Sequence, residues 1–152
     1  MFPEFGQFTL ILAWIYSFFL ALLPLIGVVQ KKEALQRTAT PVAWGMFFFM
    51  AVAFAILMYA FITDDFSVAI VTQNSNTALP WFFKISATWG NHEGSMLLWI
   101  LMLGGWTVAV SLFAKSLTIE LKGAVLGVLG IIAFGFLTFI LFTSNPFARM
   151  LP

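Results

Sequence analysis

The chain has 152 residues, of which 62% are hydrophobic, 18% are aromatic and only 9% are charged, and its net charge at pH 7 is +1. A soluble domain carries roughly 25% charged residues, so this composition argues against a soluble globular domain, and the near-neutral charge gives no reason to expect a nucleic-acid partner. The sequence contains no cysteine, which excludes a thiolate metal site or a redox pair within it.

Four long stretches of the sequence carry no charge, namely those between Glu4 and Lys31, Arg37 and Asp64, Glu93 and Lys115, and Lys122 and Arg149. Each is longer than the ~20 residues that a helix needs to cross a bilayer. Inside lipid the backbone must satisfy its own hydrogen bonds, which favours helices. We therefore predict an all-α, polytopic membrane protein whose transmembrane helices span about 7–29, 42–62, 95–114 and 123–142.

Two features of these spans bear on packing and on transport. In the last span, Gly123 and Gly127 have the spacing that lets two helices approach closely. None of the four spans contains a charged residue. Because intramembrane ionisable groups mark proton and ion pathways, their absence from the sequence argues against a standalone pump or antiporter and weakens the alternative of a transporter component.

The basic residues predict the orientation in the membrane. Most of them lie in two short stretches, as Lys31, Lys32, Arg37, Lys115 and Lys122. Basic residues near helix ends are retained on the cytoplasmic side. Loops 30–41 and 115–122 are therefore predicted to be cytoplasmic, and both termini and the long loop 63–94 are predicted to be periplasmic.

The loop 63–94 is far longer than a connector between neighbouring helices, and loops of this length are functional or disordered. Its many aromatic and β-branched residues argue against disorder. Residues 74–80, NSNTALP, read as a turn. Residues 80–86, PWFFKIS, suit a short helix at the level of the lipid headgroups; the alternative is a surface that docks another subunit or a flat ligand.

The string WGNHEGS holds the one histidine of the sequence, His92, followed by Glu93. A zinc motif of the type H-E-x-x-H is excluded because the second histidine position is Met96. No nucleophile elbow accompanies His92, so a hydrolytic triad is not supported. Asn91 is suited to cap the following helix, and Glu93 would lie at the positive end of its dipole. A capped helix mouth and a polar cluster for a cofactor or partner both remain open.

Several strings resemble the CcmF/NrfE haem lyase family of cytochrome c-type biogenesis proteins. They are PEFGQFTLILA, RTATPVAWG, DDFSVA, QNSNTALP, WGNHEGS and FILFTSNPFARMLP. The resemblance runs through all 152 residues in order. It implies a multi-helix protein of the bacterial inner membrane that works with other cytochrome c maturation subunits. In such proteins, haem from a haem chaperone is attached covalently to apocytochrome c.

The sequence departs from the family in lacking a tryptophan-rich WWD segment and the family's haem-ligating histidines. It therefore resembles the N-terminal portion alone, and we do not expect this portion to be catalytic by itself. Haem is the cofactor that the family implies, with its ligands outside this sequence. Direct ligation of haem iron by His92 is a third alternative for that residue.

We hypothesise that loop 63–94 supports the haem-binding outer part of the protein or contacts partners. The candidate residues near haem or a partner surface are Trp81, Trp89, Asn91, His92 and Glu93. No catalytic or metal-binding residue is predicted. A rival hypothesis is a small membrane scaffold subunit that recruits partners without contacting haem.

Overall fold

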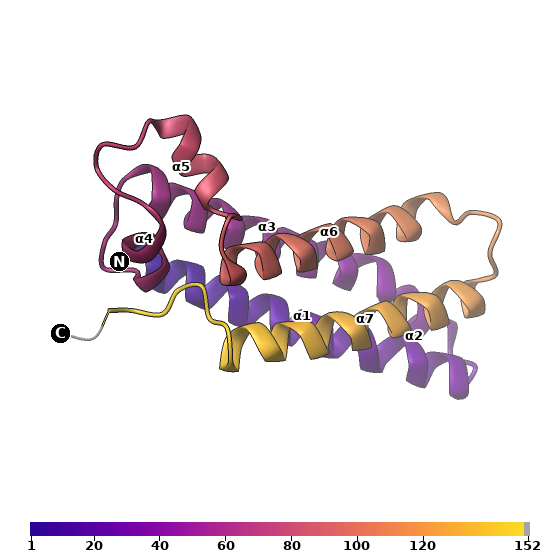
Figure 1. Cartoon of the computed structure of the whole chain (residues 1–152). Coiled ribbons are helices and arrows are strands. Elements are labelled where there is room, and N and C mark those ends of the chain that lie inside the picture. Colours follow the sequence, from indigo (N-terminus) through magenta and orange to yellow (C-terminus); the bar gives the residue numbers. More distant parts are fainter. Residues whose placement is uncertain (151–152) are drawn as a thin grey trace.

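The computed structural model describes residues 1–150, and Figure 1 shows the long helices running side by side as one elongated bundle. The helices are α1 (Phe2–Val29), α2 (Glu33–Arg37), α3 (Ala39–Ile62), α4 (Ala69–Asn74), α5 (Trp81–Ala87), α6 (His92–Phe113) and α7 (Ile119–Phe142). Four of them are long and apolar enough to cross a membrane. The predicted all-α fold with four membrane-length helices is confirmed.

The long helices begin earlier than the charge pattern predicted. The first begins at Phe2 rather than near residue 7, and α6 begins at His92 rather than at residue 95. The prediction was too short because charged residues were kept out of the spans, whereas Glu4 and Glu93 lie in first helical turns, where the helix dipole favours a carboxylate. The connection predicted as 63–94 therefore ends at residue 91.

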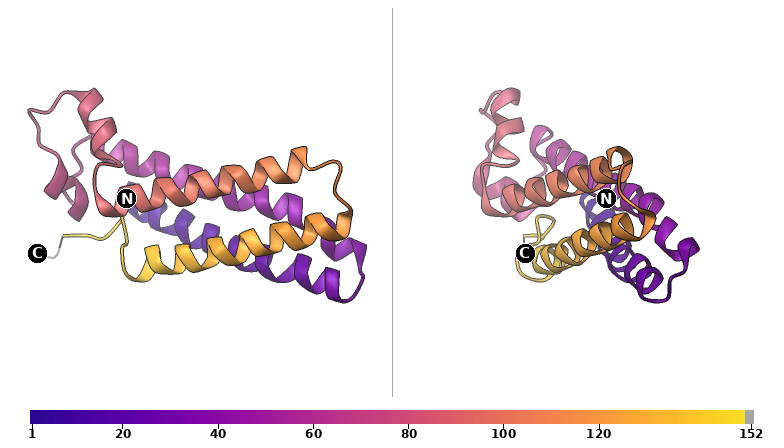
Figure 2. Two further views of the ribbon diagram at one scale, coloured as in Figure 1. Left: turned by 45° about the vertical axis from the view of Figure 1, so that its right-hand side comes forward. Right: turned by 90° about the vertical axis from the view of Figure 1, so that its right-hand side faces the viewer.

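Helix α1 packs most extensively against α3 and α7, and α6 completes the bundle by packing against the same two helices. Figure 2 shows the four helices around a common axis. The buried stripe of α1 alternates steps of three and four residues and consists of Pro3, Gly6, Leu10, Ala13, Ser17, Leu20, Pro24 and Gly27. Large apolar side chains such as Phe8 and Phe18 are exposed on its other faces. Small residues inside and large ones outside are typical of a membrane bundle.

Glycines of α7 set how closely it approaches α1. A Cβ atom on Gly127 would lie 2.6 Å from Cγ of Leu25, and one on Gly130 would lie 2.6 Å from the backbone nitrogen of Ala21. Close packing through Gly127 was predicted from its spacing to Gly123, but Gly123 faces Gln36 of α2 instead. The closest approach to α1 is therefore made by Gly127 and Gly130.

Candidate functional site at the loop end of the bundle

Most of the strings that resemble the haem lyase family meet at one end of the bundle. We call it the loop end; it comprises residues 1–6, 63–95 and 143–150. Figure 1 shows the N-terminus, α4, α5, the start of α6 and the C-terminal trace together at this end. The opposite end, which we call the turn end, comprises residues 30–40 and 114–122. The strings PEFGQ, DDFSVA, WGNHEGS and NPFAR are therefore neighbours in space although they are far apart in the chain.

The C-terminal segment is tied to the start of the long connection by backbone pairing. The amide of Ala69 donates to the carbonyl of Ala148 at 2.9 Å, and the amide of Met150 donates to the carbonyl of Ser67 at 3.1 Å. The side chain of Asp65 accepts hydrogen bonds from the amide and hydroxyl of Ser67 at 3.2 Å and 2.5 Å. These bonds fix the backbone of residues 65–69 beneath the C-terminal segment.

Arg149 joins three segments of the loop end. Its guanidinium donates to the hydroxyl of Ser67 and forms an ion pair with Glu4. Just before it, Phe147 packs on α1 so closely that a Cβ atom on Gly6 would lie 2.2 Å from the phenyl ring. The segments that carry PEFGQ, DDFSVA and NPFAR thus contact one another directly.

A partly buried ion pair holds α5 against the end of α3. The ammonium group of Lys84 lies 2.5 Å from Oδ2 of Asp64, with 8% and 21% of the two side chains exposed. In contrast, the three aromatic residues that open α5, Trp81, Phe82 and Phe83, are each more than half exposed. In a helix at a protein surface in water, the charged side chain faces the solvent and the aromatic rings face the core. In α5 the charged side chain faces the protein and the rings face outward.

The string WGNHEGS forms a tight turn from α5 into α6. The side-chain oxygen of Asn91 accepts a hydrogen bond from the amide of Gly94 at 2.7 Å, so the predicted N-cap is confirmed. Its side-chain nitrogen donates to the carbonyl of Ala87 at 2.9 Å. A Cβ atom on Gly94 would lie 1.7 Å from the carbonyl oxygen of the buried Thr88. Asn91, Gly94 and Thr88 therefore serve the structure of the turn.

His92 and Glu93 open α6 immediately after that turn. His92 is exposed, its Nδ1 lies 3.4 Å from the hydroxyl oxygen of Ser144, and its ring centroid lies 6.5 Å from that of Phe139. Glu93 is half-buried in the first turn of α6. The imidazole thus connects the start of α6 to the end of α7 and keeps part of its surface accessible.

The structure brings together four of the five predicted site residues. Trp89, Asn91, His92 and Glu93 lie in or beside the turn that opens α6. Trp81 lies at the start of α5, and that helix runs from there toward α6 (Figure 1), so Trp81 is separated from the others by the length of α5, about 10 Å at 1.5 Å per residue. The site is therefore a strip along α5 rather than one pocket.

The loop end also contains functional candidates that reading the sequence did not select, namely Asp64, Lys84 and Arg149. Their partners lie 20 to 145 residues away, so no local motif indicates them. The sequence indicates these three residues only through their charge, because they belong to the small set of charged residues outside the two basic stretches. Opposite charges gathered at one end of a membrane bundle are expected to pair.

The described residues, 1–150, contain no group of three or more His, Cys, Asp or Glu side chains that could hold a metal ion.

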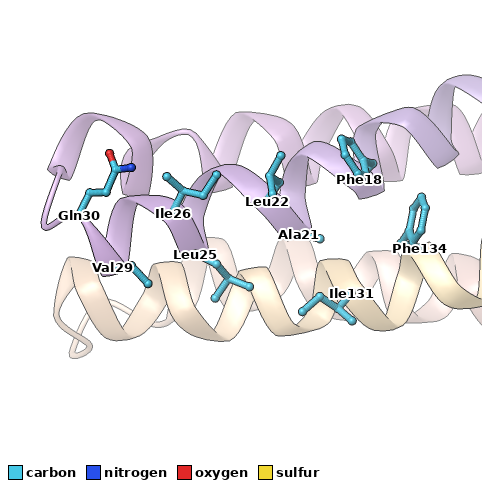
Figure 3. A pocket seen from close by; sticks show the side chains of 9 residues that line it. All are labelled: Phe18, Ala21, Leu22, Leu25, Ile26, Val29, Gln30, Ile131 and Phe134. Carbon is cyan, nitrogen blue, oxygen red and sulfur yellow. The ribbon is translucent and has the colours of Figure 1, made fainter.

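An apolar groove between α1 and α7 is shown in Figure 3. Phe18 and Phe134 lie near one end of it and Gln30 near the other, and Gln30 is the one polar residue among the described side chains that line it. Such a groove suits apolar groups and offers no acid, base or metal ligand.

Comparison with known proteins gives consistent results over the whole chain. The cytochrome c-type biogenesis protein CcmF of Pseudomonas fluorescens is 52% identical over 150 residues, 99% of this chain. CcmF of Escherichia coli K12 is 44% identical over 152 residues, 100% of this chain. The biogenesis protein NrfE of Haemophilus influenzae is 43% identical over the same number. The chain belongs to the CcmF/NrfE family of cytochrome c-type biogenesis proteins.

A solved structure of the family, a cytochrome c haem lyase CcmF, superposes with a TM-score of 0.92 at 28% identity, covering 99% of this chain and 25% of that one. The chain spans about a quarter of the length of its family relatives, 23% of the Pseudomonas fluorescens protein and 24% of the Escherichia coli protein. No protein-family model matches the chain. Family membership, which the quoted strings predicted, is confirmed, and with its four apolar helices the chain is a membrane protein.

Proposed function

We propose that this chain is the N-terminal transmembrane region of a haem lyase subunit of cytochrome c maturation in the bacterial inner membrane, and that its loop end supports haem delivery to apocytochrome c. The observation that carries the proposal is the convergence of PEFGQ, DDFSVA, WGNHEGS and NPFAR on one end, held by the ion pairs Lys84–Asp64 and Arg149–Glu4. Long-range contacts of this kind support a defined surface rather than a mobile loop.

The chemistry of that surface suits a flat, amphipathic ligand. Exposed rings of Trp81, Phe82 and Phe83 lie on α5, and the polar groups of His92 and Glu93 follow at the start of α6. A porphyrin has an apolar face and charged propionates, so aromatic and polar groups side by side can contact both parts. The described residues offer haem iron one imidazole at most. A second histidine ligand to iron would therefore come from outside this chain, and in this proposal His92 and Glu93 act as neighbours of the haem.

The test is substitution of His92 and of Glu93 by alanine in the full-length protein, with covalent haem on a c-type cytochrome as the readout. We expect several-fold less haem attachment with unchanged amounts of the protein in the membrane. Gln73→Ala is the matched control, because Gln73 is an exposed polar residue of the same end. If both variants attach haem to the cytochrome as fully as the wild type, His92 and Glu93 do not belong to the functional site.

The rival proposal is a scaffold that recruits maturation partners without contacting haem. The exposed aromatic face of α5 fits either a partner or a haem. Trp81→Ala together with Phe82→Ala separates the two. Loss of haem absorbance from the purified protein, with its maturation subunits still attached, supports the haem-contacting surface. Loss of the subunits with haem retained supports the scaffold.

In the proposed orientation, the loop end faces the periplasm. The turn end faces the cytoplasm because it contains the basic loops, and basic residues near helix ends are retained on that side. Because this sequence has no cysteine, single cysteines can report the side on which each position lies. Asn76→Cys at the loop end should react with an impermeant thiol reagent added outside intact spheroplasts. Ser116→Cys at the turn end should react only after the membrane is opened. The reverse pattern would overturn the orientation.

A further inference from the structure

The turn end contains a small polar pocket that the proposed function does not use. It is formed where α2, the start of α3 and the start of α7 meet, and Figure 1 shows these elements together at the end opposite α5. The side chains that matter for its chemistry are Gln36, Arg37, Thr40, Ile119, Lys122 and Leu126. Two of these are cations, and they come from different helices.

The cations of this pocket are only weakly compensated. Arg37 has one acidic partner, Glu33, at 3.4 Å on the same short helix, and both side chains are about two-thirds exposed. An exposed pair of this kind contributes little. Lys122 has no carboxylate within 4.0 Å among the residues that the structure describes. Glu120 lies nearby in the first turn of α7 but does not line the pocket. The pocket therefore carries net positive charge.

The inner wall of the pocket is fixed and already satisfied. Gln36 is buried, and its side-chain nitrogen donates to the carbonyl of Gly27 at 3.0 Å. The same side chain packs against α7, where a Cβ atom on Gly123 would lie 3.4 Å from Cβ of Gln36. Gln36 thus holds α2 between α1 and α7, and α2 in turn places Arg37 across from Lys122.

The position of the pocket defines the kind of anion that can reach it. Helices α3 and α7 begin here, so the pocket lies at the end of two membrane-length helices, where we expect the bundle to leave the hydrocarbon. Its polar groups adjoin the apolar side chains of Ile119 and Leu126. An anion that combines a phosphate with an acyl chain would meet both surfaces at this depth. Basic pockets between transmembrane helices are typical binding sites for acidic lipid headgroups.

We propose that this pocket binds the phosphate of an anionic phospholipid, with Arg37 and Lys122 as the cationic contacts and Thr40 as a further hydroxyl donor. Arginine donates two parallel hydrogen bonds to phosphate, and lysine contributes a point charge. The bound lipid would connect α2 to α7 at the turn end. The proposal is independent of the haem function and of which leaflet the turn end faces.

The first test measures lipid that remains with the purified full-length protein, using native mass spectrometry after extraction from membranes containing phosphatidylglycerol. The double variant Arg37→Gln, Lys122→Gln should retain at least tenfold less phosphatidylglycerol than the wild type, because both cationic contacts to the phosphate are lost; a tenfold loss in affinity corresponds to about 1.4 kcal/mol. The matched control is Lys31→Gln with Lys115→Gln, which removes the same charge from exposed positions at the same end. Equal losses in both double variants would overturn the proposal.

The second test separates a lipid site from a site for free phosphate and shows that the variants fold. Thermal unfolding is followed in nanodiscs of phosphatidylcholine, with phosphatidylglycerol or inorganic phosphate added. We expect phosphatidylglycerol to raise Tm of the wild type and of the Lys31, Lys115 control, and to leave Tm of the Arg37, Lys122 variant unchanged. The variant and the wild type should unfold at similar temperatures in phosphatidylcholine alone. An equal rise with inorganic phosphate would overturn the assignment to a lipid.

Discussion

The two ends of the bundle treat charge in opposite ways. At the loop end, Lys84 is buried against Asp64, and Arg149 is paired with Glu4 across almost the whole length of the chain. At the turn end, Lys31, Lys32 and Lys115 are exposed, and the ion pair Arg37–Glu33 lies within one short helix. One end uses charge to join distant segments, and the other presents charge to its surroundings.

This difference has an energetic consequence. Removing one partner of a buried ion pair leaves an uncompensated charge in a poorly hydrated place, whereas an exposed pair contributes about 0–1 kcal/mol. Substitution at the Lys84–Asp64 pair should therefore be costly. The exposed pairs, Arg149–Glu4 at the loop end and Arg37–Glu33 at the turn end, should tolerate substitution better. The predictions below compare the loop end with the apolar middle of the bundle, in the protein purified in detergent, from the largest expected effect to the smallest.

The largest effect is expected from Gly94→Val. The new Cβ atom would overlap the carbonyl oxygen of Thr88, since it would lie 1.7 Å away, and both groups belong to the backbone of a tight turn. We expect the free energy of unfolding to fall by more than about 3 kcal/mol, because an overlap with backbone exceeds the ordinary overpacking of side chains, which costs about 1–3 kcal/mol. Gly135→Ala is the control, because nothing lies within 4 Å of its Cβ position. Similar stability of the two variants in denaturant titration would disprove the close contact.

Lys84→Met should destabilise the loop end by about 3 kcal/mol, the low end of the range for breaking a buried pair, because Asp64 keeps some contact with water. The double variant Lys84→Met, Asp64→Leu should recover much of that loss, since no charge is then left unpaired. Limited proteolysis within residues 63–91 gives a local readout. Additive losses in the double-mutant cycle would mean that the two groups do not interact.

Asn91→Ala tests the helix cap at the same turn. It removes the acceptor of the Gly94 amide, and we expect a loss of about 1 kcal/mol in the free energy of unfolding. Asn91→Asp should keep most of the stability because a carboxylate oxygen can accept the same hydrogen bond. If alanine and aspartate behave alike in thermal unfolding, the cap does not stabilise α6.

The smallest effect is expected in the apolar middle of the bundle. The indole nitrogen of Trp14 donates to the hydroxyl oxygen of Thr138 at 2.8 Å and links α1 to α7. Thr138→Val should cost about 0.6 kcal/mol, the average for a hydrogen bond between helices in a membrane. Thr107→Val, which breaks a bond within α6 alone, is the comparison variant. A loss for Thr138 as large as that for Lys84 would contradict the contrast between the ends and the middle.

Much of the candidate site followed from local pattern. The cap by Asn91 and the acidic first turn at Glu93 were predicted because capping depends on residues three apart in the sequence. The role of Gly94 was not predicted, because the atom that excludes a side chain there is the carbonyl of Thr88 in the preceding segment. The inward direction of Lys84 was likewise not predicted, since composition alone places a lysine in water.

By itself the sequence determined that the chain would form four helices long and apolar enough to cross a membrane. The reason is that each uncharged segment must satisfy its own backbone hydrogen bonds in lipid, and a helix does so. It also indicated the family through strings spread over the whole chain. Only the tertiary structure decided that those strings share one end of the bundle, that Arg149 reaches Glu4, and that the aromatic face of α5 points outward. Such contacts depend on how the helices pack, and no local periodicity encodes which distant charges will meet.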